Sequence, residues 1–133
     1  MNPVFADTYY FLALLHKSDA ARAKAVALAE RVTNPILTTA WVLTEIGDAL
    51  AAPAHRPRFL QLLEALGADP GCTIVPSSPA TFDAGVALYA ERSDKGWTLT
   101  DCISFVVMRQ YGVTEALTGD RHFEQAGFDI LLT

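Results

Sequence analysis

The segment from Trp97 to Gly112 reads as a helix that is apolar on almost every side. A helix with no wide polar face is buried inside a protein rather than laid on its surface. Near its beginning this helix nevertheless carries an acid, Asp101, and one turn later on the same side a hydroxyl, Ser104. The segment therefore predicts a core helix that brings a carboxylate to the edge of an interior in which it is poorly solvated.

Short apolar runs alternate with helical segments over the rest of the chain. This alternation is typical of an α/β protein in which helices cover both faces of a parallel sheet. The expected strands are residues 4–6, 36–38, 72–75, 116–118 and 129–132. The expected helices are residues 8–16, 20–32, 40–51, 58–66, 79–92, 97–112 and 121–126. No internal repeat or linker divides them, so we expect residues 1–133 to form a single domain.

Size and composition agree with a substantial core. The chain has 133 residues, of which 51% are hydrophobic, and it is therefore not expected to be disordered. No charge-free apolar run approaches the ~18 residues of a membrane span, and Asp7 interrupts the apolar N-terminal stretch, unlike a signal peptide. We expect a cytoplasmic protein with no membrane partner, in which Cys72 and Cys102 are free thiols.

The net charge of −5 disfavours long-range attraction of nucleic acid. A polyanionic partner would have to be held by local basic residues or by bound cations. The candidates for a local phosphate-binding rim are Arg92, Lys95, Arg109 and Arg121. No glycine-rich phosphate loop occurs, which argues against P-loop and dinucleotide-binding folds.

Four acids are candidates for a shared site. Asp7 and Asp120 come just after predicted strands, and in open α/β sheets ligands bind outside the carboxyl ends of the strands. Asp101 begins a helix whose N-terminus can face the same edge, and Glu45 lies beside the apolar face of a mid-chain helix. Each Asp can also be explained as an ordinary helix N-cap, and Asp101 as part of a capping box with Thr98.

Four carboxylates that converge on one pocket raise one another's pKa, and they are stable together mainly when hard cations neutralise them. Oxygen ligands without a nearby His or Cys select Mg²⁺ or Mn²⁺. One such ion, or two about 3.5–4 Å apart, can support the hydrolysis of a phosphodiester. The hydroxyls placed to support the carboxylates or a phosphate are those of Thr8, Thr100 and Ser104. The scattered histidines His16, His55 and His122 are interpreted as structural.

The order of these acids resembles the PIN domain. The match rests on Asp7 after the first strand, Glu45 in a mid-chain helix, L-T-D-C-I-S-F around Asp101 and L-T-G-D-R-H-F around Asp120. The nearest relatives look like VapC-type toxin ribonucleases of bacterial toxin–antitoxin pairs. The resemblance implies a three-layer α/β/α sandwich with a five-stranded parallel sheet, commonly dimeric. It also implies that these four acids bind the catalytic metal for RNA hydrolysis and that a cognate antitoxin blocks the site.

Other interpretations of the pattern stay open. A non-catalytic PIN-like module that binds RNA or a protein partner would carry the same elements. A phosphoacceptor receiver domain also has clustered acids beside a parallel sheet, but it needs a lysine after the last strand, and Asp129 to Thr133 contain none. The RNA target and the cleavage site do not follow from the sequence.

Two segments are candidate surfaces for the antitoxin or for a second copy of the chain: the alanine-rich helix 20–32 and the segment 59–66. In the second, Leu60, Leu63 and Leu66 recur at helical spacing, and Phe59 extends the stripe. The alternative is that this stripe faces the sheet.

Overall fold

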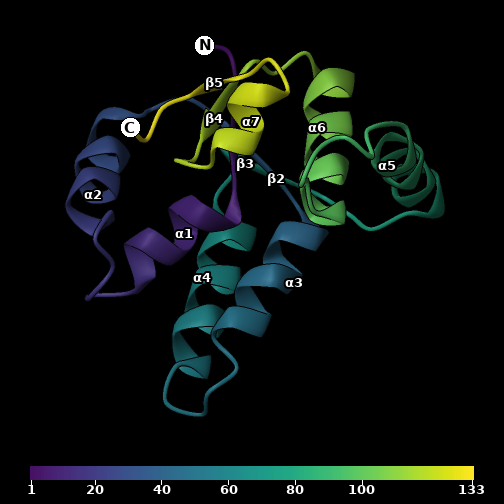
Figure 1. The fold of residues 1–133 in the computed structure, drawn as a ribbon. Helices are drawn as coiled ribbons and strands as arrows, with labels where there is room; N and C mark the ends of the chain where they lie inside the picture. Colours follow the sequence, from purple (N-terminus) through teal and green to yellow (C-terminus); the bar gives the residue numbers. More distant parts are fainter.

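The computed structural model describes residues 1–133, which form a five-stranded sheet in the order β3-β2-β1-β4-β5. The strands are β1 (Val4–Ala6), β2 (Ile36–Thr39), β3 (Cys72–Val75), β4 (Glu115–Leu117) and β5 (Asp129–Ile130). All neighbouring strands are parallel. Seven helices connect and cover them, so the predicted α/β/α sandwich with five parallel strands is confirmed (Figure 1).

Every predicted helix is present, and its ends lie within two residues of the expected ones. The helices are α1 (Thr8–Leu15), α2 (Arg22–Arg31), α3 (Ala40–Ala49), α4 (Arg56–Ala68), α5 (Pro79–Glu91), α6 (Leu99–Tyr111) and α7 (Arg121–Gln125). The largest change is in α4, which starts before Pro57 because proline is tolerated in the first helical turn. It also continues through Gly67 to Ala68, beyond the end expected at residue 66, where the glycine after it indicated a helix terminus. None of the helices has the length and apolar character needed to cross a membrane.

The strand order reverses beside β1. The chain runs outward from β1 through β2 to β3 and then returns to β4 on the other side of β1. Ligands of open α/β sheets bind outside the carboxyl ends of the strands at such a reversal. Asp7 directly follows β1, and Asp120 lies just beyond β4, which ends at Leu117. The topology therefore places both acids beside the reversal point.

Helix α6 is the buried helix that the sequence predicted. Phe105, Val107 and Met108 are fully buried, and the ring of Phe105 contacts the rings of Trp97 and Phe123 at centroid distances of 5.0 and 4.9 Å. The helix ends at a glycine in the left-handed conformation (φ 68°), the usual residue at that position. Figure 1 shows α5 alongside α6, and these two helices form the closest helix pair of the fold.

The contact between α5 and α6 depends on Gly85. A Cβ atom at this position would lie 2.3 Å from Cγ1 and 3.2 Å from Cα of Ile103. We therefore expect Gly85→Ala to lower the free energy of unfolding by about 1–3 kcal/mol, although alanine favours the helix. Gly67 in α4 is the matched control, because nothing lies within 4 Å of its added Cβ. Gly67→Ala should stabilise by about 0.5–1 kcal/mol, and equal stabilisation by both variants in urea unfolding would contradict the close packing.

Candidate active site

Asp7 is held inside the protein at the carboxyl end of β1, where it is only 5% exposed. Its side chain makes no N-cap hydrogen bond with α1, so the capping alternative does not explain this acid. Instead, Oδ2 accepts a hydrogen bond from Thr118 Oγ1 at 3.0 Å. Burial raises the pKa of Asp7 to about 7, with further increases from the charges of Asp101 and Glu45, against the opposing effect of the Thr118 hydrogen bond.

Thr118 connects Asp7 to the second acid at a strand end. Its fully buried hydroxyl donates to Asp7 and accepts from the backbone N–H of Asp120 at 3.0 Å. Asp120 Oδ1 in turn caps α7 by accepting the N–H of His122 at 2.9 Å, as the structural interpretation of this acid predicted. Capping uses one carboxylate oxygen and leaves the group partly open, since its side chain is 30% exposed. Thr118 was not identified from the sequence.

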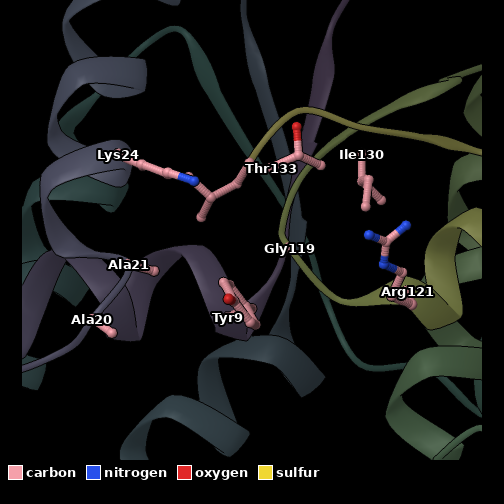
Figure 2. A pocket seen from close by; sticks show the side chains of 9 residues that line it. Tyr9, Ala20, Ala21, Lys24, Gly119, Arg121, Ile130 and Thr133 are labelled. Carbon is pink, nitrogen blue, oxygen red and sulfur yellow. The ribbon is translucent and has the colours of Figure 1, made fainter.

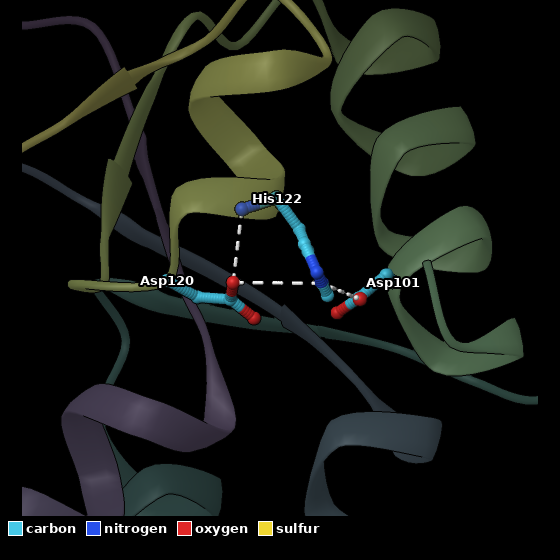
Figure 3. A group of neighbouring side chains, drawn as sticks. All are labelled: Asp101, Asp120 and His122. Carbon is cyan, nitrogen blue, oxygen red and sulfur yellow. Dashed lines mark hydrogen bonds and ion pairs between the residues drawn. The ribbon is translucent and has the colours of Figure 1, made fainter. Parts of the chain in front are cut away.

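Asp101 also combines two roles. It forms the predicted capping box with Thr98, whose backbone N–H donates to Asp101 Oδ2 at 3.1 Å. The same oxygen lies 2.9 Å from Nδ1 of His122, and this nitrogen is 3.6 Å from Oδ1 of Asp120 (Figure 3). A ligand atom from each of Asp101, Asp120 and His122 lies within 4.8 Å of the other two, which is close enough for one metal ion to bind all three.

The position of His122 corrects the sequence analysis, which treated it as structural and expected no histidine near the carboxylates. In the structure its imidazole points from the first turn of α7 to the space between Asp101 and Asp120 (Figure 3). The sequence feature that could have identified His122 is its position. It lies two residues after Asp120, an acid that starts a helix at the ligand-binding edge of the sheet. An imidazole in the donor set favours Mn²⁺ over Mg²⁺, because Mg²⁺ takes oxygen ligands almost exclusively.

Glu45 reaches the same place from α3. Its Oε1 accepts a hydrogen bond from Thr8 Oγ1, and its charge acts on Asp7. Thr118 and His122 thus connect Asp7, Asp101 and Asp120, and Glu45 contacts Thr8, the residue that follows Asp7. Of the supporting hydroxyls, Thr8 makes the expected contact with a carboxylate, whereas no hydrogen bond joins Thr100 to any of the acids.

The charge balance of this cluster fits a divalent cation. No lysine or arginine lies within 4 Å of any of the four carboxylates, and His122 is their only basic contact. Ser104 follows Asp101 by one turn, and its fully buried hydroxyl has no hydrogen-bond partner. Buried polar atoms normally find a partner, so an unpaired one beside clustered acids is consistent with a hydrated ion at this site. The residues whose ligand atoms lie close enough together to hold one ion are Asp101, Asp120 and His122.

The predicted basic rim is only partly present. Arg109 lies instead over the ring of Phe128, at 5.9 Å. Arg92 pairs with the exposed Asp94 at 3.0 Å and stacks on Trp97 at 5.1 Å. Arg121 directly follows Asp120 and remains the member of the set that adjoins the acids.

Comparison with known proteins gives one family. The sequence model of the PIN domain family matches residues 4–129. The matched segment extends from β1 into β5. No curated protein sequence is significantly similar to the chain.

Several solved structures share the fold. VapC20 of Mycobacterium tuberculosis, described as a sarcin–ricin loop cleaving toxin, superimposes with a TM-score of 0.84 and 22% identity over 94% of this chain and 95% of its own. FitAcB from Neisseria gonorrhoeae has a TM-score of 0.65 and 19% identity over 96% of each chain. VapBC2 from Rickettsia felis, bound to a DNA fragment from its promoter, has a TM-score of 0.66 and 14% identity over 97% of each chain.

Proposed function

Because this chain belongs to the PIN domain family, we propose that it is a Mg²⁺- or Mn²⁺-dependent endoribonuclease and the toxin of a type II toxin–antitoxin pair. The observation that carries the proposal is the convergence of Asp7, Glu45, Asp101 and Asp120 on one edge of the sheet without a lysine or arginine to neutralise them. The likeness to a structure described as a sarcin–ricin loop cleaving toxin supports the same function.

Each residue of the site has a part in this proposal. A bound ion would supply Lewis-acid assistance for hydrolysis of the phosphodiester. Asp101, Asp120 and His122 offer ligand atoms close enough to share it, and Asp7 and Glu45 add negative charge nearby. The hydroxyls of Thr118 and Thr8 fix the rotamers of Asp7 and Glu45, because each donates to one carboxylate oxygen and leaves the other for a ligand.

The direct test is cleavage of a mixed RNA pool by the purified protein. We expect cleavage in Mn²⁺, its loss in excess EDTA, and its return when Mn²⁺ is restored. Binding of the RNA pool without cleavage in either metal would instead identify a non-catalytic PIN-like module.

An antitoxin partner is the second part of the proposal. Both FitAcB and VapBC2 are named as structures of paired components, and they share this fold. On this chain the predicted stripe of α4 divides into two parts. Phe59 and Leu66 pack against the core, whereas Leu60 and Leu63 remain 60% and 39% exposed. We propose that the exposed pair is part of the antitoxin-binding surface; pairing of two copies of the chain is a further expectation.

Leu63→Glu tests this surface. The side chain is already in contact with water, so the variant should fold with a melting temperature close to that of the wild type and lose affinity for the antitoxin encoded beside its gene. Leu62→Glu is the matched control, because Leu62 packs against the core and a charge there should destabilise the fold severely. Light scattering reports whether pairing is lost as well. Unchanged antitoxin affinity and unchanged mass for folded Leu63→Glu would exclude this surface.

A further inference from the structure

A hollow of about 370 Å³ opens between α1, α2 and the last residues of the chain (Figure 2). Its lining includes Tyr9, Lys24, Gly119 and Arg121. Tyr9 lies two residues after Asp7, while Gly119 and Arg121 are the two neighbours of Asp120. The hollow is therefore lined by the chain segments that carry Asp7 and Asp120, yet none of its side chains is one of the four acids. Its size is in the lower part of the range of small-ligand sites, about 300–1,000 Å³.

Two cationic groups face each other across this hollow. Figure 2 shows the amine of Lys24 and the guanidinium of Arg121 directed into the opening from opposite sides. Lys24 makes no ion pair, and Arg121, with a side chain that is 73% exposed, uses one nitrogen to pair with Glu124 at 2.8 Å. In a chain with a net charge of −5, these cations give the acidic edge a local site for an anion.

An aromatic ring lies at the bottom of the same hollow. Tyr9 is 42% exposed, and its ring packs against the turn between β4 and α7 at Gly119. A Cβ at position 119 would lie 2.8 Å from two atoms of this ring and 2.9 Å from the carbonyl oxygen of Leu132. Only glycine leaves room for the ring in this position. Exposed aromatic rings beside paired cations are the combination that binds single-stranded nucleic acid, through base stacking and phosphate contacts.

We propose that this hollow binds one nucleotide of the RNA strand next to the cleavage point, with its phosphate between Lys24 and Arg121 and its base on Tyr9. The inference rests on the proposed function and adds a site that holds the substrate beside the acids. An acidic segment of the antitoxin would satisfy the two cations but has no need of the exposed aromatic face. The combination of charge, ring and size therefore favours RNA.

The salt dependence of RNA binding tests the phosphate contacts. A short fluorescein-labelled RNA of mixed sequence is titrated by anisotropy in Mn²⁺, with every variant placed in an Asp101→Asn background to prevent cleavage. Each lost phosphate contact lowers the slope of log K against log salt by about 0.7, which corresponds to about 5-fold in affinity at about 0.1 M salt. Because Lys24 and Arg121 contact the same phosphate in this proposal, Lys24→Ala combined with Arg121→Ala should lower the slope by about 0.7. Lys17→Ala removes one positive charge at an exposed lysine outside the hollow; it is the control for loss of charge elsewhere and should leave the slope unchanged.

Substitutions of Tyr9 test the stacking contact independently. Tyr9→Leu should weaken binding by about 5-fold or more without changing the salt slope, and Tyr9→Phe should restore it. The inference is overturned by an unchanged slope in the double variant, by an equal decrease in Lys17→Ala, or by loss of antitoxin affinity alone. None of these affects the proposed function if the wild type still cleaves RNA in Mn²⁺. Failure of the parent protein to bind RNA overturns the inference, and absence of cleavage by the wild type removes the proposed function separately.

Discussion

Asp101→Asn is expected to reduce RNA cleavage by about 10³-fold or more while the protein remains folded. The amide fills the same volume and can still accept the N–H of Thr98, so the capping box at the start of α6 is kept. It brings no negative charge, however, so a metal ligand is weakened. In EDTA the variant should be as thermostable as the wild type or more so, because a charge that acts on buried Asp7 is removed. The measurements are kcat/KM in Mn²⁺ and thermal unfolding in EDTA.

Asp94→Asn is the matched control for this prediction. Asp94 lies near Asp101 in sequence, but it is exposed and pairs with Arg92 at 3.0 Å rather than with the acid cluster. The Asp94→Asn variant should cleave RNA at the wild-type rate. Asp7→Asn, like Asp101→Asn, should lose cleavage and remain folded. Wild-type cleavage by purified Asp101→Asn would exclude it from the catalytic set.

The stability of the metal-free protein should fall as the pH rises from about 4 to about 7. Asp7 has a pKa of about 7 in the folded state against 3.8 as the ordinary value, so the folded protein holds a proton that the unfolded chain has already released between these values. Stability attributable to this group is therefore present at low pH and lost as the pH rises through the folded pKa. The difference corresponds to about 4 kcal/mol at most. Asp7→Asn cannot titrate and should lose most of this slope.

Urea unfolding in EDTA at a series of pH values measures this effect. The comparison is between the wild type, Asp7→Asn and the control Asp94→Asn, which should keep the wild-type slope. Parallel curves for the wild type and Asp7→Asn would show that Asp7 is not the buried acid responsible.

Much of the fold was predictable because its elements carry local signals. Helix α6 is apolar on almost every side, which predicted that it is buried. The alternation of short apolar runs with helices predicted a parallel sheet. Capping of α6 by Thr98 and Asp101 was also predictable, since a capping box is a pattern of neighbours in sequence. In α4, by contrast, Gly67 looked like a terminator but is helical, because a glycine in open space costs too little to end a helix.

The arrangement of the site was less predictable because it depends on contacts between distant segments. The sequence identified the acids but could not distinguish Asp7, whose side chain caps nothing, from Asp120, which caps α7. The hydroxyl of Thr118 that joins them looks in sequence like any strand residue. The hollow beside them is formed by α1, α2 and the C-terminal residues, and no local pattern relates Tyr9 and Lys24 to Arg121.

The most direct test of the proposed active site is a parallel titration of Mn²⁺ binding and RNA cleavage. Binding is followed by the EPR signal of free Mn²⁺, and cleavage is measured in the same solutions, for the wild type and for a variant with both Asp7→Asn and Asp120→Asn. In the wild type, binding and cleavage should rise together with free Mn²⁺, and the ion should raise the melting temperature. All three effects should be lost in the double variant. Cleavage in EDTA, or Mn²⁺-dependent cleavage that persists in the double variant, would contradict a catalytic metal site at these acids.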